Sequence, residues 1–123
     1  PEDFIVEKHR ASVFFETTLD TKLRMLGIEQ LLISGCNTEF CVETTIRDGY
    51  YRDMDIIVLR DCVAGPRKSF HEDTLAKVEV YFGAVIGLDE IEDVILPPDR
   101  WVGDQRAEAA KLTEETHAAA LKG

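Results

Sequence analysis

The four consecutive apolar residues Ile56-Ile57-Val58-Leu59 constrain the fold of this chain more than any other feature. A strand with one solvent-exposed face alternates apolar and polar residues. A wholly apolar run is instead typical of a strand that is buried on both faces of the sheet. Leu31-Leu32-Ile33 is a second such run, and a segment with helical spacing, residues 39–51, separates the two. Strands that alternate with helices over these lengths predict a parallel α/β sheet with right-handed crossovers.

The rest of the pattern extends this α/β prediction along the chain. The predicted strands cover residues 4–6, 28–34, 55–60 and 94–96. The predicted helices cover residues 19–26, which stop at Gly27, residues 39–51, and a third segment that the capping box Ser69-Phe70-His71-Glu72 opens and that runs through Phe82. We expect residues 1–100 to belong to one domain and residues 101–123, rich in Ala and Glu, to form a helical tail.

Composition narrows the class of protein. The 123 residues are 45% hydrophobic and 31% charged, which suits one globular domain with a buried core. The formal net charge of -10 argues against nucleic-acid partners and against anionic membrane surfaces. Three cysteines without framework spacing indicate reduced thiols, so we expect a cytoplasmic protein. Because the sequence starts at Pro1, we expect it to be a piece of a longer chain.

A strand–turn–helix segment places Cys41 where a thiol can do chemistry. The apolar run 31–33 ends in small residues, Thr38 offers a cap, and Cys41 follows in the first turn of the predicted helix. Unpaired backbone N–H groups and the positive end of the helix dipole favour a thiolate there. The same kind of N–H group can stabilise an oxyanion on a substrate carbonyl, and those of Asn37 and Cys41 are the candidates.

Lys8 is the second candidate for chemistry. It ends the first predicted strand, and Cys41 lies just beyond the second. Open parallel sheets place their sites outside the carboxyl ends of the strands, so the ammonium and the thiol could meet over one crevice. Glu39 would weaken the case for a thiolate unless its carboxylate points outward. The residues that could border a substrate, or could simply pack, are Arg10, Ser12, Phe14 and Thr38.

Other chemical motifs are missing from the sequence. His9 and His71 have no partner at metal-ligand spacing, so we predict no metal site and no cofactor. Cys36 and Cys41 do not form a Cys-x-x-Cys redox motif, because four residues separate them instead of two. Gly35 alone is not a phosphate-binding loop.

The segment Gly35-Cys36-Asn37-Thr38-Glu39-Phe40-Cys41-Val42-Glu43-Thr44-Thr45 resembles the central signature of the isochorismatase-like cysteine hydrolase superfamily, as does Arg47-Asp48-Gly49-Tyr50 after it. The upstream segment Glu7-Lys8-His9-Arg10-Ala11-Ser12-Val13-Phe14 resembles the lysine segment of that family. The resemblance covers about residues 3–96. It implies a three-layer α/β/α sandwich around a parallel sheet, with the N-terminal strands of the sheet absent from this sequence.

The resemblance also implies roles for individual residues. Hydrolases of this family use an Asp, Lys and Cys triad, in which Cys41 would be the nucleophile and Lys8 the lysine. A cis peptide between Cys36 and Asn37 would then precede an oxyanion hole made by the N–H groups of Asn37 and Cys41. The aspartate of the family lies well upstream of its lysine, and nothing in this sequence corresponds to it.

The activity implied by the resemblance is cysteine-dependent hydrolysis of a C–N amide bond in a small ureido or carbamoyl-type amide. It would proceed through a thioester acyl-enzyme, with ammonia or an amine as the leaving group. Members of the family are commonly dimers or tetramers, so we expect a homo-oligomer, and a companion chain could carry the N-terminal half. Two alternatives stay open: a non-catalytic fragment or partner-binding half, and a redox-sensitive thiol protein.

Overall fold

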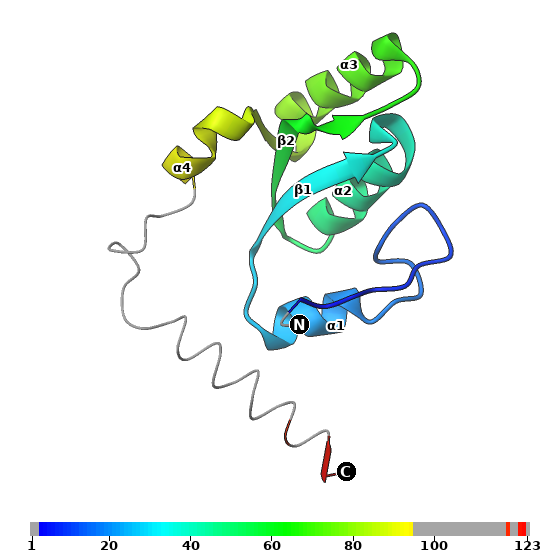
Figure 1. Ribbon diagram of the computed structural model, residues 1–123, viewed down its shortest axis with the longest axis vertical. Coiled ribbons are helices and arrows are strands. Elements are labelled where there is room, and N and C mark those ends of the chain that lie inside the picture. Colours follow the sequence, from blue (N-terminus) through cyan, green and yellow to red (C-terminus); the bar gives the residue numbers. More distant parts are fainter. Residues whose placement is uncertain (1–2, 95–117, 119–120, 123) are drawn as a thin grey trace. The chain divides into compact units, whose positions relative to one another are not determined.

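The computed structural model describes residues 3–94, 118 and 121–122, in two units that span residues 1–90 and 91–123 (Figure 1). The strands of the first unit are β1 (Gln30–Cys36), β2 (Asp55–Ala64) and β3 (Gly83–Ile86). Its helices are α1 (Leu19–Met25), α2 (Glu43–Tyr50) and α3 (Lys68–Lys77), with the shorter turns η1 (Thr38–Val42), η2 (Val78–Phe82) and η3 (Leu88–Glu90). The described residues of the second unit are helical, namely α4 (Ile91–Val94) and residues 118, 121 and 122.

The sheet is parallel throughout and its strands follow the order of the chain, β1-β2-β3. In register, Leu32 lies beside Ile57, and Ile57 lies beside Ala84. Parallel neighbours require a crossover connection, and the helices α2 and α3 provide one each. The parallel α/β sheet predicted from the two apolar runs is therefore confirmed.

The core lies on the face of the sheet that α2 and η2 cover. Ile33, Ile56 and Val58 project from β1 and β2 into one cluster with Ile46 of α2 and Val78 of η2. The side chains of Ile46, Val58 and Val78 are fully buried. Each such side chain stabilises the fold by about 1.5–3 kcal/mol relative to an exposed one. The two crossovers have the same hand and step across the sheet in the same direction. The helix α2 and the helical segment formed by α3 and η2 therefore lie on the same face.

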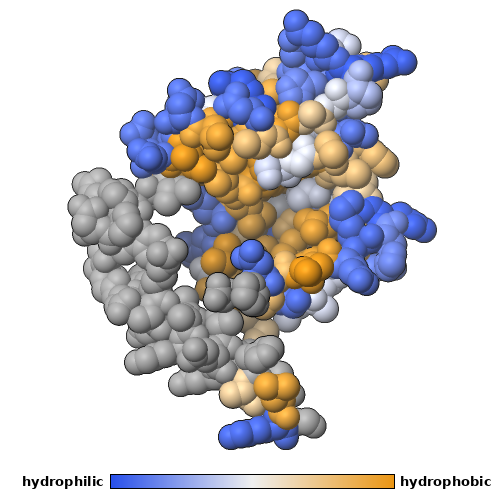
Figure 2. Space-filling view, in the orientation of Figure 1, coloured by the Kyte–Doolittle hydropathy of each residue, from blue (hydrophilic) through white to orange (hydrophobic). Residues whose placement is uncertain are grey.

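The opposite face of the sheet is also apolar. Alternation along the strands assigns Leu32, Ile57 and Leu59 to this face. Leu32 is 41% exposed. Figure 2 shows apolar side chains gathered over the strands, with hydrophilic side chains around them. None of the helices in the described ranges is long and apolar enough to cross a membrane.

The helix α1 ends as the sequence predicts. Gly27 has a positive φ of 66°, a conformation that costs glycine little because it has no Cβ. The N–H of Gly27 donates to the carbonyl of Arg24, and the N–H of Ile28 donates to that of Leu23. This pair of bonds satisfies carbonyls that the end of a helix leaves unpaired.

The N-terminal strand prediction is wrong, because residues 4–6 form no strand. They pair with none of the described strands, and Ile5 is 87% exposed. The ring of Phe4 lies 5.1 Å from the ammonium of Lys22 on α1 instead. An apolar triplet is compatible with a strand, but a strand forms only where a neighbour supplies its hydrogen bonds.

The sequence predictions for the residues after β2 are also wrong in part. The capping box at residues 69–72 is not formed, because α3 begins earlier, at Lys68, with the extended residue Arg67 as its N-cap. The four-residue strand β3, bounded by Gly83 and Gly87, was not predicted. Val94 of the predicted strand 94–96 ends the helix α4, and residues 95–96 lie outside the described residues. Four acidic residues precede Val94, and carboxylates favour the start of a helix.

Candidate active site

A cavity of about 410 Å³ lies at the carboxyl end of β1 and brings Lys8 and Cys41 together. Parallel sheets place their sites at this edge. The strand contributes its last residues, η1 contributes Cys41, and the loop before α1 contributes Lys8. The residues that line the cavity are Lys8, Ala11, Val13, Leu32, Ile33, Ser34, Gly35, Cys36, Cys41, Val42 and Thr45.

Gly35 turns β1 toward the cavity. Its φ is +124°, in the region that side chains disfavour, so glycine is the residue that fits here. The pairing of β1 with β2 shifts at this point, from Ile33 beside Val58 to Gly35 beside Val63. Such an irregularity bends a strand and re-aims the residues that follow it. One residue further on, the peptide bond between Cys36 and Asn37 is cis.

Cys41 lies half-buried in η1, directly after this turn. Asn37 is the N-cap and is extended, with φ −87° and ψ 142°. Its carbonyl accepts hydrogen bonds of 3.1 Å from the N–H groups of Phe40 and Val42, which flank Cys41. The first-turn N–H groups of a helix lack earlier carbonyl partners, and the N–H of Cys41 belongs to this turn. An arrangement of this kind can hold a developing oxyanion. Asn37 is exposed and does not line the cavity.

The ammonium of Lys8 is fixed by its own loop. Nζ donates to the carbonyl of Arg10 at 3.1 Å and to that of Ala11 at 3.2 Å. An ammonium has three hydrogens, so one is left for a partner in the cavity. The loop thus orients a positive charge that shares the cavity with the thiol of Cys41.

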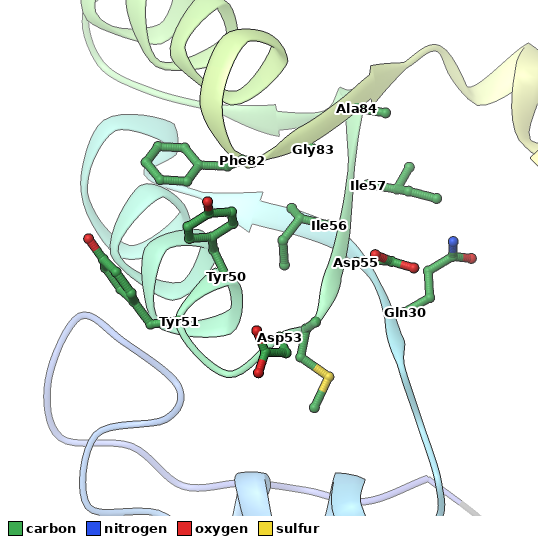
Figure 3. A pocket seen from close by; sticks show the side chains of 11 residues that line it. Gln30, Tyr50, Tyr51, Asp53, Asp55, Ile56, Ile57, Phe82, Gly83 and Ala84 are labelled. Atoms are coloured by element: carbon green, nitrogen blue, oxygen red, sulfur yellow. The ribbon is translucent and has the colours of Figure 1, made fainter.

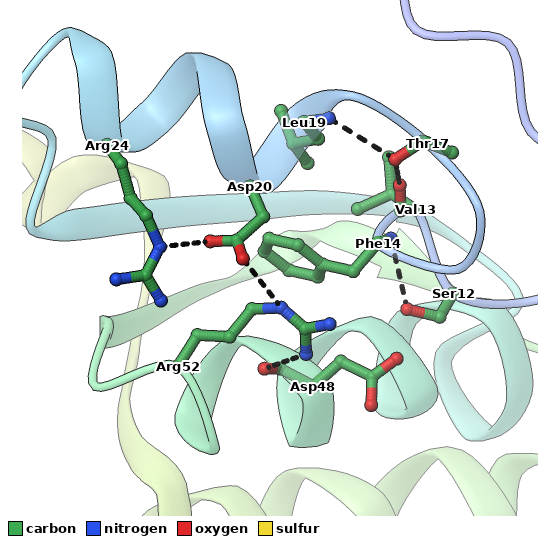
Figure 4. Close-up of polar contacts among 9 residues, drawn as sticks. All are labelled: Ser12, Val13, Phe14, Thr17, Leu19, Asp20, Arg24, Asp48 and Arg52. Atoms are coloured by element: carbon green, nitrogen blue, oxygen red, sulfur yellow. Dashed lines mark hydrogen bonds and ion pairs between the residues drawn. The ribbon is translucent and has the colours of Figure 1, made fainter.

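The loop that carries Lys8 is anchored to α2. The N–H of Val13 donates to Oγ1 of Thr45 at 3.1 Å. The N–H of Phe14 donates to Oγ of Ser12 at 3.1 Å, and the Phe14 ring lies 4.8 Å from the guanidinium of Arg52 at the end of α2 (Figure 4). These contacts set the position of Lys8 relative to Cys41.

Arg52 also contacts α1, and so links that helix to the loop and to α2. Its guanidinium donates to the carbonyl of Asp48 at 2.9 Å and lies 3.6 Å from the carboxylate of Asp20 (Figure 4). Asp20 in turn pairs with Arg24 at 2.9 Å. The loop, α1 and the end of α2 therefore form one connected support.

The structure gives the four predicted substrate-bordering residues other surroundings. Ser12, Phe14 and Thr38 are at most 4% exposed and do not line the cavity. Ser12 and Phe14 fix the loop instead, and Asn37 takes the cap position that Thr38 was expected to hold. Arg10 is exposed, and its Nη1 donates to the carbonyl of His9 at 2.7 Å. The roles that these residues take here are packing and hydrogen bonding.

The cavity also contains residues that were not predicted to belong to the site. Cys36 ends β1, and Thr45 lies four residues after Cys41, which places both on one side of a helix. That helical spacing is a signal that could have found Thr45. Ala11 and Val13 reach the cavity only through the path of the loop, which has no sequence signature.

Glu39 does not share the cavity with Cys41. Its carboxylate lies against Gly65 in the loop after β2, where a Cβ would come within 2.0 Å of Oε2. That oxygen is buried and has no hydrogen-bond partner within the part of the chain that is described. The carboxylate therefore does not point outward, and it lies outside the set of residues that line the cavity.

A larger cavity, of about 710 Å³, lies at the opposite edge of the sheet (Figure 3). It is lined by the first residues of all three strands, Gln30, Asp55 and Gly83, and by Tyr50 and Phe82, whose ring centroids are 5.3 Å apart. Its described lining holds no cysteine, lysine or histidine. Because Cys41 and Lys8 lie at the carboxyl ends of the strands, we assign the site to the smaller cavity. Within the described residues, no group of three metal-ligating side chains comes together.

Comparisons with known proteins agree with this fold and place the chain in a family. A sequence model of the isochorismatase domain matches residues 1–90. The ureidoacrylate amidohydrolase RutB of Methylobacterium radiotolerans is 40% identical over 102 residues, which are 81% of this chain and 39% of that protein. The chain therefore spans about two fifths of the length of this relative.

Solved structures show the same architecture. An isochorismatase-like hydrolase from Alkaliphilus metalliredigens matches with a TM-score of 0.72 and 30% identity, over 76% of this chain and 51% of that one. N-carbamoylsarcosine amidase from Thermoplasma acidophilum matches with a TM-score of 0.65 and 38% identity, over 73% and 51%. The fold is that of an α/β protein with a parallel sheet, and the turn after β1 carries the thiol of Cys41. The chain belongs to the isochorismatase family.

Proposed function

We propose that this chain is part of a cysteine-dependent amidohydrolase that acts on small ureido or carbamoyl amides. The observation that carries the proposal is the cavity shared by Cys41 and Lys8 at the carboxyl end of β1. The similarity to a ureidoacrylate amidohydrolase and to an N-carbamoylsarcosine amidase supports amide hydrolysis. A ureido or carbamoyl group presents a planar carbonyl bonded to nitrogen. A thiolate can attack the carbon of that carbonyl.

In the proposed reaction, the sulfur of Cys41 adds to the substrate carbonyl and forms a C–S bond. The N–H groups of Asn37 and Cys41 hold the oxygen of the tetrahedral intermediate. Collapse breaks the C–N bond, and the nitrogen leaves as ammonia or an amine after it takes up a proton. Water then hydrolyses the thioester and returns the thiol.

Lys8 stabilises the negative charge on sulfur in this scheme. The Cys41 thiol loses its proton when the sulfur attacks, and the leaving nitrogen must gain one; none of the described residues that line the cavity has a carboxyl group that could carry this proton. We propose that an aspartate from outside these 123 residues, in the longer chain or a companion chain, supplies that proton. We also propose that the complete protein is a cytoplasmic homo-oligomer.

A hydrolysis assay tests the proposal. Purified protein that contains this chain is incubated with ureidoacrylate, N-carbamoylsarcosine and nicotinamide, and released ammonia is measured over time. We expect turnover of one of the two open-chain ureido compounds, and no turnover in Cys41→Ser. Cys62→Ser is the matched control, since Cys62 lies in β2 and does not line the cavity. Ammonia release that survives Cys41→Ser would contradict the proposal.

A further inference from the structure

A hydrogen bond from α3 reaches the turn that carries Cys41. Thr38 is the first residue of η1 and is fully buried. Its Oγ1 lies 2.8 Å from Nδ1 of His71, a residue of α3. Nothing in the proposed reaction uses either side chain, although Thr38 lies three residues before the thiol.

The partner of the Thr38 hydroxyl matters because a threonine hydroxyl can also bond to backbone N–H groups a few residues further along the chain. Hydroxyls of Ser and Thr at the start of a helix readily bond to the N–H groups of its first turn. In η1 no side chain caps these N–H groups. The hydroxyl of Thr38 is committed to His71 instead. The bond therefore keeps a competing oxygen away from the N–H groups that would hold the oxyanion.

The docking of α3 does not depend on His71 alone. Thr74, one turn later on α3, donates its hydroxyl to Glu43 of α2 at 3.1 Å. Lys77, one further turn along, lies 2.6 Å from the same carboxylate. Val78 adds a fully buried side chain to the core directly after α3. These contacts should hold α3 in place when His71 is replaced, which makes its role testable.

We propose that His71 is a positioning residue, which acts on Cys41 through Thr38. It binds the Thr38 hydroxyl and so keeps the N–H groups around Cys41 available to a thiolate or an oxyanion. The inference rests on the proposed function for its catalytic meaning. Its effect on the thiol itself can be measured without any substrate.

The test is a set of variants read out by alkylation. Iodoacetamide labelling of Cys41 is followed by peptide mass spectrometry near neutral pH, with Cys62 of the same chain as internal reference. We expect His71→Leu to slow Cys41 by about tenfold, the factor that corresponds to one redirected hydrogen bond. His71→Asn, whose amide can still reach Thr38, should stay within about twofold of the parent protein.

A double variant separates positioning from simple destabilisation. The double variant of Thr38→Val and His71→Leu has no hydroxyl at position 38 that could bond to the N–H groups around Cys41. The labelling rate of Cys41 should therefore return to that of the parent protein, although both partners of the hydrogen bond are lost. Unchanged Cys41 labelling in a folded His71→Leu protein, or a double variant slower than either single one, would overturn the proposal. If His71→Leu fails to fold, the variants His71→Asn and Thr38→Val test the proposal instead. Cys41 must then be alkylated in both variants at the rate measured in the parent protein.

The alkylation rates are independent of turnover, so the two proposals can fail separately. A parent protein that labels at Cys41 but hydrolyses no amide contradicts the proposed function alone. In a parent protein that hydrolyses amides, His71→Leu should lower kcat more than it changes KM, because the N–H groups act in the transition state. Equal kcat in the two proteins would count against the role of His71.

Discussion

Lys8 and Cys41 come from distant segments of the sequence, and the fold gives them one cavity. Two carbonyls of the loop hold the ammonium of Lys8, and they orient its charge. A fixed cation near a thiol favours the thiolate over the thiol. This pair is the residue-scale basis of the proposed chemistry.

Replacement of Lys8 by Met should therefore slow the alkylation of Cys41 by iodoacetamide by about tenfold near neutral pH. The aliphatic stem is kept, so the loss reports the charge. Lys68→Met is the matched control, because the Lys68 side chain is 87% exposed and pairs with Glu72 at 3.6 Å. Equal labelling rates in Lys8→Met and the parent protein would remove Lys8 from the account.

From the sequence we predicted that Lys8 and Cys41 would meet over one crevice, because both follow apolar runs, and the two residues line one cavity. The sequence did not identify the environment of Thr38, which is buried against His71 although both residues are polar. The two lie far apart along the chain, and only the packing of α3 brings them together. Sequence spacing predicts contacts along one helix or strand, and contacts between elements need the fold.

At the scale of elements, the loop before α1 depends on α2 for its position. The bond from the Val13 N–H to Thr45 is part-buried, so removal of the acceptor leaves an unpaired donor. Thr45→Val should lower the free energy of unfolding by about 1–2 kcal/mol and speed the exchange of the Val13 amide hydrogen. Urea unfolding and hydrogen exchange measure the two effects.

Thr44→Val is the control for that loop contact. The Thr44 hydroxyl donates to the Phe40 carbonyl at 2.6 Å within its own helical segment and does not reach the loop. Its removal should change the free energy of unfolding by less than about 0.5 kcal/mol. Equal losses in the two variants would mean that Thr45 does not anchor the loop.

The contact between α2 and α3 should make stability depend on pH. The hydrogen bond of Lys77 with Glu43 raises the pKa of that ammonium above its ordinary value, against the opposing effect of desolvation. The folded state thus holds this proton more tightly than the unfolded state does. Its stabilisation is complete below the ordinary lysine pKa of about 10.4 and is lost as pH rises through the folded value.

Lys77→Met should accordingly lower the free energy of unfolding by about 0.5–1 kcal/mol at pH 7. The difference from the parent protein should shrink as pH rises beyond the ordinary lysine pKa. Urea unfolding at a series of pH values measures it, and a difference that stays constant into the alkaline range would contradict the pairing. Lys68→Met serves again as the exposed control.

The parallel sheet was predictable because β1 and β2 are wholly apolar at their centres and a helical segment separates them. The strand β3 was missed because its four residues follow a helix that the pattern extended to Phe82. Residues 4–6 were predicted as a strand on their apolar character alone. Whether such a triplet becomes a strand depends on a partner, and no local signal shows one.

At the scale of the molecule, β1 is an edge strand of the sheet that residues 3–94 form, and Leu32 on it is 41% exposed. An unpaired edge with apolar neighbours invites another chain. We expect a homodimer or tetramer by light scattering, and a shift toward the monomer in Leu32→Lys. Ile5→Lys, which removes an apolar side chain that is 87% exposed outside the sheet, should leave the mass unchanged. A parent protein that is monomeric at every concentration would contradict this.

We infer that Cys41 is the activated thiol of this chain, and brief treatment with iodoacetamide checks this inference. Intact mass spectrometry counts the labelled thiols, and peptide mapping assigns them among Cys36, Cys41 and Cys62. We expect one fast addition, at Cys41, near neutral pH. Labelling of Cys41 at the same rate as Cys62, or more slowly, would contradict the account.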